Sequence, residues 1–190
     1  HTMRRLQGLC HDTRLYNFSD NHDVERLPNK LRNRDHIRHI ALLVYTLWGI
    51  PSIYYGSEFG IEGKKEWGSD WPLRPCLELA DYTDAEKTNP VTSIYAALGR
   101  LKAECPELSW GEFKELTLTT QSYAYARVLD GKAVVAVYNN GDSPVSMEFQ
   151  LPVEASGVED LLADCVGSQE WGKLKVQLPS NYATLLRLVG

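Results

Sequence analysis

Residues 15–23 of this 190-residue chain read Leu15-Tyr16-Asn17-Phe18-Ser19-Asp20-Asn21-His22-Asp23. The first five favour a β-strand, because they include two aromatic residues and little that favours a helix. The polar residues that follow are turn formers, so the strand is predicted to end in a loop. Taken alone, that loop is best interpreted as a solvated turn with Asx hydrogen bonds. Its carboxylate and imidazole groups could also bind sugar hydroxyls, ligate a metal or transfer protons.

A helix and a second strand follow the loop. Apolar residues recur at helical spacing from Ile37 to Trp48, with Asn33 or Asp35 as the N-cap and with Gly49 and Pro51 as the stop. The buried segment 51–56 then predicts a strand, with Glu58 just beyond it. Strand, helix and strand predict a right-handed βαβ unit with a parallel pair. Residues 20–23 and 56–58 should therefore meet on one rim, as active-site loops do in an α/β barrel.

The segment 59–89 is a long loop, and loops of this length commonly cover a site. Its Trp67 and Trp71 could stack on sugars, or could equally pin the loop to the body of the protein. Asn89 is predicted to cap a helix that begins at Pro90 and ends before Pro106.

From Trp110 onward, short β-rich segments alternate with turns. The predicted strands are 113–119, 122–129, 132–138, 145–151, 174–178 and 183–189, and Asp130-Gly131 is a two-residue hairpin turn. The fold class is therefore α/β followed by all-β. Residues 1–108 form the first domain, and residues 109–190 form an antiparallel β-sandwich.

Composition limits the partners. The formal net charge is -5, so neither nucleic acid nor an anionic membrane is an expected partner, and no apolar run reaches the length of a bilayer span. Cys10, Cys76, Cys105 and Cys165 are widely spaced and lack a metal-ligand pattern. Free thiols favour a reducing, cytoplasmic compartment, and we expect neither a metal site nor a cofactor.

Two motifs carry a family resemblance. Residues 18–23, Phe-Ser-Asp-Asn-His-Asp, and residues 49–58, Gly-Ile-Pro-Ser-Ile-Tyr-Tyr-Gly-Ser-Glu, resemble the ends of the seventh and eighth barrel strands in the α-amylase family of glycoside hydrolases. The segments 123–127 and 135–140 resemble that family's C-terminal domain. The resemblance implies strands 7 and 8 of a (β/α)8 TIM barrel with their helices, followed by the C-terminal β-sandwich.

The resemblance also implies site residues and a reaction. The family cleaves α-glucosidic bonds by a retaining mechanism, in which Asp23 would stabilise the transition state and His22, Asn21 and Arg26 would bind the substrate, an α-glucan or maltooligosaccharide. The nucleophile and the acid of the family follow strands 4 and 5, so this chain would lack both and be inactive alone. The family often has Asp where Ser57 stands, and Arg74-Pro75 lies in a divergent setting.

Three alternatives accompany this interpretation. Asp23 and Glu58 could themselves be nucleophile and acid, although retaining catalysis needs carboxyl groups about 5 Å apart in a closed pocket. The chain could instead be a non-catalytic carbohydrate-binding or protein-interaction module of the same fold. Strands taken from a barrel also have open edges, so we expect the isolated chain to self-associate through residues 10–60.

Overall fold

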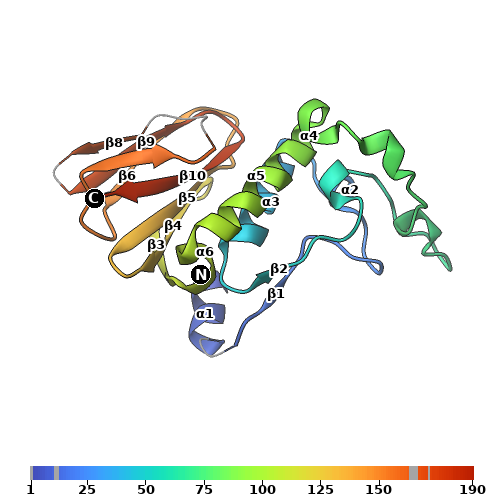
Figure 1. The fold of residues 1–190 in the computed structure, drawn as a ribbon, viewed down its shortest axis with the longest axis horizontal. Coiled ribbons are helices and arrows are strands. Elements are labelled where there is room, and N and C mark those ends of the chain that lie inside the picture. The colour runs from blue at the N-terminus through green and yellow to red at the C-terminus, as the bar shows by residue number, and fades with distance from the viewer. Residues whose placement is uncertain (1, 11–12, 163–166, 171) are drawn as a thin grey trace.

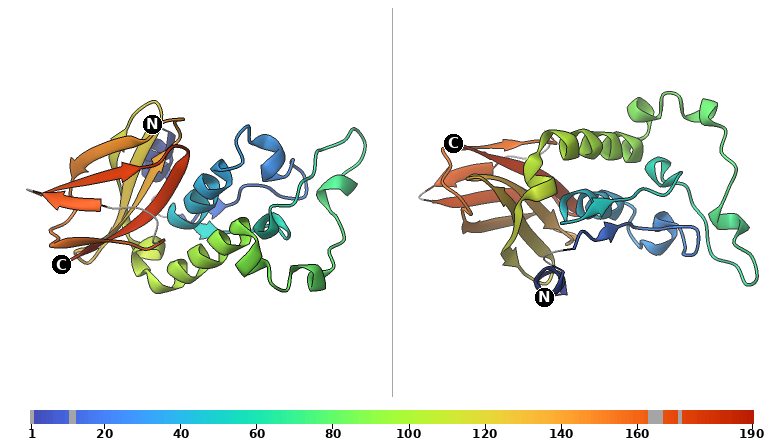
Figure 2. Two further views of the ribbon diagram at one scale, coloured as in Figure 1. Left: turned by 90° about the horizontal axis from the view of Figure 1, so that it is seen from above. Right: turned by 60° about the horizontal axis from the view of Figure 1, so that its bottom comes forward.

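The computed structural model describes residues 2–10, 13–162, 167–170 and 172–190. A three-stranded sheet, a five-stranded sheet and a layer of helices follow one another along the long axis of the molecule, and a long loop extends at the end away from the sheets (Figure 1). The views in Figure 2 show the same order of layers from two other directions.

The N-terminal part contains the predicted βαβ unit. Its elements are α1 (Thr2–Leu9), β1 (Tyr16–Asn17), α2 (Leu27–Lys30), α3 (His36–Thr46) and β2 (Ile50–Pro51). Strands β1 and β2 are parallel, which confirms the predicted pairing, but each has only two residues. The second strand is shorter than predicted for two reasons. Pro51 has no N–H to donate, and the partner strand β1 ends close to the turn at residues 19–23, so little of it is left to pair with β2. The helix α1 was not predicted.

The two predicted helix starts differ in how they are capped. Asp35 occupies the N-cap position of α3, but its side chain makes no capping hydrogen bond, and the side chain of Asn33 accepts a hydrogen bond from the Asp35 amide instead. At α5 (Pro90–Glu104), the Asn89 side chain accepts a hydrogen bond from the Val91 amide at 2.9 Å, as predicted. The long loop between them contains three 3-10 turns, Ser57–Phe59, Trp71–Leu73 and Leu79–Tyr82, and the short helix α4 (Ala85–Thr88).

The C-terminal part follows α6 (Pro106–Trp110) and forms two antiparallel sheets. The five-stranded sheet has the order β3-β4-β5-β10-β7, and the three-stranded sheet has the order β6-β9-β8. All six predicted strands are present, as β3 (Glu112–Leu118), β4 (Ser122–Leu129), β5 (Lys132–Asn139), β6 (Val145–Gln150), β9 (Lys173–Leu178) and β10 (Tyr182–Val189). Two four-residue strands, β7 (Gly157–Asp160) and β8 (Gly167–Glu170), were not predicted.

The hairpin between β4 and β5 shows why its two turn residues were predictable. Asp130 and Gly131 both have a positive φ, of 49° and 75°. Two successive positive φ values are what a type I′ turn requires, and its twist matches that of the paired strands.

The five-stranded sheet is buried on both faces. Along β5, alternate residues face opposite sides: Val135 and Val137 pack against the three-stranded sheet, whereas Val134 and Ala136 pack against the helices. The same alternation separates Leu185 from Leu186 in β10. The helical side of this core is formed mainly by α3 and α5, through residues such as Ile37, Ala41, Leu42, Ile94, Leu98 and Leu101.

One hydrophobic core therefore contains residues from both 1–108 and 109–190. The division of the chain into two domains at this boundary stays a prediction. Buried Arg127 strengthens the same junction, since its guanidinium donates to the carbonyl of Thr46 at the end of α3 and to that of Gly111 before β3, both at 2.8 Å. The helices and the five-stranded sheet should consequently unfold together.

Candidate functional site

The polar turn after β1 places two side chains beside each other in solvent. The Asn21 carboxamide oxygen accepts a hydrogen bond from the Asp23 amide at 2.8 Å, which closes the Asx turn. His22 Nε2 lies 3.2 Å from Asp23 Oδ2, and their side chains are 54% and 60% exposed. An imidazole and a carboxylate are thus presented together, with their faces open to a ligand.

Asp20, one residue before this turn, points the opposite way. Its side chain is buried, with Oδ2 accepting from the Leu27 amide at 2.9 Å and Oδ1 accepting from the Ser57 hydroxyl at 2.7 Å. The Ser19 hydroxyl also donates to Oδ1, at 3.1 Å. Buried carboxylates are stable only when they are hydrogen-bonded in this way. The Asp20 carboxylate therefore fixes where the exposed turn begins.

Arg26 lies beneath the turn and has no exposed surface. Its guanidinium donates to the carbonyl of Tyr55 at 2.7 Å and to that of Leu73 at 2.8 Å, and it lies 4.1 Å from the centroid of the Tyr54 ring. The predicted role of Arg26 in substrate binding stays a prediction. The contacts of Arg26 support a structural role. Arg26 connects the loop after β1, the segment after β2 and the long loop.

Ser57 links the two buried charges. Its hydroxyl donates to Asp20 at 2.7 Å and accepts from Arg26 Nη1 at 3.4 Å, so carboxylate and guanidinium are joined through one oxygen. Removing either charge would leave the other buried without compensation. Sequence reasoning missed this Asp20-Ser57-Arg26 network. Its only sequence signal is the Ser that stands at position 57 where the resembled family often has Asp.

The long loop is attached to the turn by charged side chains. Lys65 Nζ donates to the Asp23 carbonyl at 2.8 Å, and Arg74 Nη2 lies 3.9 Å from Asp23 Oδ1. Arg74 also contacts Asp70 at 3.3 Å, and Lys65 contacts it at 3.5 Å. The Asp23 carboxylate therefore has cationic neighbours on the loop side.

Glu58 lies on the same segment as Ser57 but faces a different groove. That groove has a volume of about 470 Å³ and also contains Tyr45 and Tyr95 among its lining residues. Burial raises the pKa of Tyr45, and the charge of Glu58 raises it further. Among the contacts of the described residues, none joins Glu58 to Asp23, so the geometry gives no support to these two as a nucleophile and acid pair.

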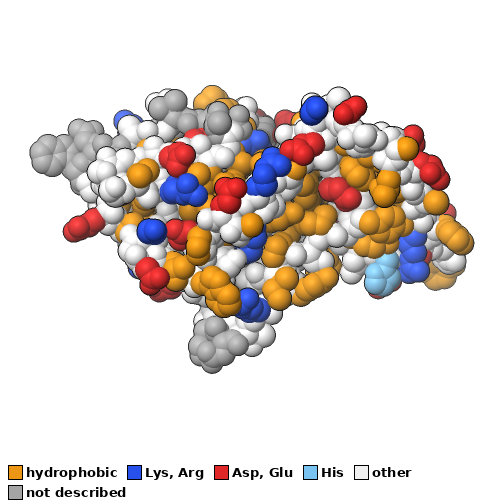
Figure 3. All heavy atoms as spheres, viewed as in Figure 1, with side chains coloured by type: hydrophobic (Ala, Val, Ile, Leu, Met, Phe, Trp, Pro, Cys, Tyr) orange, Lys and Arg blue, Asp and Glu red, His pale blue; other side chains and the backbone are white. Residues whose placement is uncertain are grey.

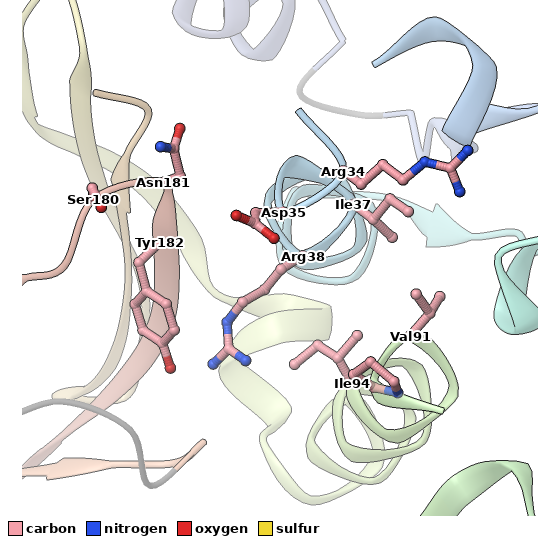
Figure 4. Close-up of a pocket in the computed structure, with 10 residues that line it drawn as sticks. Arg34, Asp35, Ile37, Arg38, Val91, Ile94, Ser180, Asn181 and Tyr182 are labelled. Atoms are coloured by element: carbon pink, nitrogen blue, oxygen red, sulfur yellow. The ribbon is translucent and has the colours of Figure 1, made fainter. Parts of the chain in front are cut away.

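A second groove, of about 310 Å³, lies between α3, α5 and the start of β10 (Figure 4). Ile37, Val91 and Ile94 form its apolar wall. On the opposite side, the Arg38 guanidinium lies 4.4 Å from the centroid of the Tyr182 ring and donates to the Ala183 carbonyl. The polar wall of this groove is thus engaged in holding the helices to the sheet.

The open strand pair is apolar. Tyr16, Phe18 and Ile50 of the β1 and β2 region are 66%, 47% and 48% exposed. Large exposed apolar side chains beside open strand edges invite pairing with another chain. Self-association through residues 10–60 stays a prediction, to be tested by light scattering over a concentration series, and a monomer at every concentration would contradict it.

Three further findings concern only the described residues. Cys10, Cys76 and Cys105 are free thiols there, whereas Cys165 lies outside the described residues. That part of the chain brings no three metal-binding side chains together. It also contains no helix that is long and apolar enough to cross a membrane.

Comparison with known proteins gives consistent relatives, although no family model matches the chain. The chain is 28% identical over 149 residues to a cyclomaltodextrinase of Thermoanaerobacter pseudethanolicus, and the alignment covers 78% of this chain and 24% of that protein. It is 29% identical over 171 residues to neopullulanase 2 of Thermoactinomyces vulgaris, and this alignment covers 86% of this chain and 28% of that protein. The chain thus spans about a quarter of the length of these curated relatives.

A solved structure shows the same fold. The crystal structure of a cyclomaltodextrin glucanotransferase with a three-domain ABC distribution matches with a TM-score of 0.80 at 23% identity, over 98% of this chain and 40% of that one. The sequence relatives and the shared fold agree with the motifs at residues 18–23 and 49–58. The chain belongs to the α-amylase family of glycoside hydrolases.

Proposed function

We propose that this chain is the C-terminal part of an α-glucan-active glycoside hydrolase, comprising the last two barrel strands, their helices and the C-terminal β-sandwich. The observation that carries this proposal is the exposed His22 and Asp23 pair at the end of one of two parallel strands, held from below by the Asp20-Ser57-Arg26 network. The cyclomaltodextrinase and neopullulanase similarities support an α-glucan as the substrate class.

In this proposal, Asp23 acts on the sugar at the bond that is cleaved. Its carboxylate accepts hydrogen bonds from the ring hydroxyls, and these bonds strengthen as positive charge develops at the anomeric carbon. His22 Nε2 lies close enough to share the same sugar, since it is 3.2 Å from Asp23 Oδ2. Asn21 acts mainly through its bond to the Asp23 amide, which fixes the turn.

The nucleophile and the acid of the retaining mechanism come from outside this chain. Two carboxylates near Asp23 are already engaged: Asp20 is buried and hydrogen-bonded, and Asp70 contacts Lys65 and Arg74. Neither is placed to attack an anomeric carbon. Closing a barrel needs eight strands, and β1 and β2 are two of them, with their outer edges open to the others.

A chimera tests the proposal. The matching segment of the Thermoactinomyces vulgaris neopullulanase is replaced by this chain, and reducing-sugar release from maltoheptaose is measured. We expect activity that falls about a hundredfold to a thousandfold in Asp23→Asn, as when a transition-state hydrogen-bond group is removed. In His22→Ala we expect a smaller loss that appears partly in KM.

The control is Asp142→Asn, since Asp142 contacts Asn181 in the sheet region, away from the strand ends. This variant should keep the activity of the chimera. A chimera with native circular dichroism that is inactive, or whose activity does not depend on Asp23, would contradict the proposal.

A further inference from the structure

We propose that Trp67 and Trp71 form an aromatic subsite, which stacks on glucose rings of an α-glucan whose neighbouring unit lies at Asp23. This inference rests on the proposed function and adds to it a second point of contact with the chain of the substrate. The two tryptophans belong to the loop formed by residues 64–71.

Both indole rings are presented to solvent. Trp67 is 103% exposed and Trp71 is 82% exposed, so neither pins the loop to the body of the protein, which was the other interpretation of the sequence. Single exposed apolar side chains are common on protein surfaces, so exposure alone does not make these two indoles a binding site. A binding site also requires that the loop hold the two indoles in place.

A tight turn presents Trp67. Glu66 and Ser69 form an antiparallel bridge, and Gly68 between them has a φ of 76°. A positive φ is adopted readily by glycine but rarely by other residues, so the sequence Trp67-Gly68 is suited to this turn. The turn places the indole of Trp67 at the tip of the loop.

The base of the loop is closed and anchored. A Cβ atom on Gly63 would lie 2.3 Å from the Pro72 carbonyl oxygen, so the two ends of the loop touch at a position where only glycine fits. Leu73, two residues after Trp71 on the same 3-10 turn, is fully buried and accepts a hydrogen bond from Arg26. The Gly63 carbonyl accepts one from the Arg26 amide at 2.9 Å. Both arms of the loop therefore end on Arg26.

The loop is also tied to Asp23. Lys65 donates to the Asp23 carbonyl and contacts Asp70 on the opposite arm of the loop, at 2.8 Å and 3.5 Å respectively. The two tryptophans are thus carried by a segment that is attached both to the backbone of Asp23 and to the residue that supports it. A ligand lying over Asp23 and extending past Lys65 would meet them.

The surroundings of the rings favour a sugar over a protein. In the sequence, charged residues flank the two tryptophans, namely Lys64, Lys65, Glu66 and Asp70. Figure 3 shows hydrophobic side chains beside Lys and Arg at this end of the molecule. A glucose ring has apolar C–H faces and a rim of hydroxyls, which match an indole face and flanking polar groups. The core of a protein–protein interface is instead depleted of charged residues.

The test is binding of maltoheptaose to the purified chain, measured by calorimetry and by tryptophan fluorescence. We expect Trp67→Ala and Trp71→Ala each to raise the Kd about tenfold, which corresponds to roughly 1.4 kcal/mol, and the double variant to lose the fluorescence change. Trp110→Ala is the matched control, because Trp110 is also exposed but lies on α6 under the Arg14 guanidinium. It should bind like the natural chain.

The outcomes are separable from those of the proposed function. Failure of the natural chain to bind maltoheptaose, or unchanged binding in the double variant with native circular dichroism, would overturn this inference. An inactive chimera together with Trp-dependent binding would overturn only the proposed function. An active chimera together with Trp-independent binding would overturn only the subsite. Equal affinity for cellohexaose would contradict selectivity for α-linked glucose.

Discussion

The β10 strand and the turn at residues 20–26 are both buried in part, but they are held by different forces. In β10, Leu185 and Leu186 face two apolar cores, and the backbone is paired with β5 along seven positions. At the turn, the neighbouring parallel strands pair over only two positions, and the buried groups are the side chains of Asp20 and Arg26. Apolar packing shapes the first region, and a few polar contacts shape the second.

This difference has a consequence for sensitivity to mutation. Apolar contacts are spread over many neighbours, so one substitution removes a fraction of the total. A polar network with few members changes as a whole when one member is removed, because the remaining groups stay buried and unpaired. The candidate site should therefore be rigid in the natural chain and easily disordered by single changes below it.

The largest effect on the candidate site is expected from removing its buried cation. Arg26→Met should destabilise residues 20–27 and 54–75 by about 3 kcal/mol, since it strands the Asp20 carboxylate and frees the Tyr55 and Leu73 carbonyls. Hydrogen exchange should accelerate in these segments while β4 and β5 stay protected.

Arg127→Met is the matched control, because Arg127 is equally buried but joins α3 to the sheet. It should accelerate exchange across the sheet junction and not selectively at the turn. Identical exchange patterns in the two variants would show that the regions are not held separately.

Two neighbouring residues of β10 compare its two cores. Leu185→Ala and Leu186→Ala should each lower the free energy of unfolding by about 2–4 kcal/mol in urea titrations, because both side chains are fully buried. If the helices and the five-stranded sheet share one core, Leu185→Ala should destabilise both in a single transition. A separate early transition of the helices would argue against the shared core.

A smaller effect is expected from the hydroxyl that joins the two charges. Ser57→Ala removes one hydrogen bond to Asp20 and one from Arg26, and should cost about 1–2 kcal/mol. Ser57→Thr retains the hydroxyl and is the control. An alanine variant as stable as the natural chain, by thermal and urea unfolding, would mean that the two charges do not depend on this link.

The smallest effect concerns pH. Burial, with Arg127 and Arg14 nearby, lowers the pKa of Lys102 from 10.5 to about 8. The unfolded chain then binds more protons than the folded chain between these values, so this group makes stability rise from about pH 8 to about pH 10.5. Since Lys102 is partly exposed, we expect about 1 kcal/mol. Urea unfolding at several pH values should show this rise relative to Lys102→Met, and parallel pH profiles would contradict it.

The sequence predicted what local patterns determine. The Asn89 cap, the Asp130-Gly131 turn and the parallel pairing around α3 depend on neighbouring residues or on one short crossover, and all three are present. The short strands β7 and β8 were missed because four residues carry too little periodicity. The exposed position of His22 and Asp23 also follows from local turn formers.

The support of the site could not be predicted in the same way. Ser57 and Leu73 are far in sequence from Asp20 and Arg26, and only the folded chain brings them together. Arginine is usually exposed, so residue type alone favours a surface position for Arg26 and gives no signal of its burial. The exposure of Trp67 likewise depends on how the loop closes at Gly63 and Pro72.

Reducing-sugar release from maltoheptaose, compared between the isolated chain and the neopullulanase chimera under the same conditions, tests whether Asp23 works only with carboxylates from other strands. We expect release by the chimera alone, and loss of that release in Asp23→Asn, because Asp23 needs a nucleophile and an acid from other strands. Release by the isolated chain that Asp23→Asn abolishes would contradict it, since a complete site would then form from these residues.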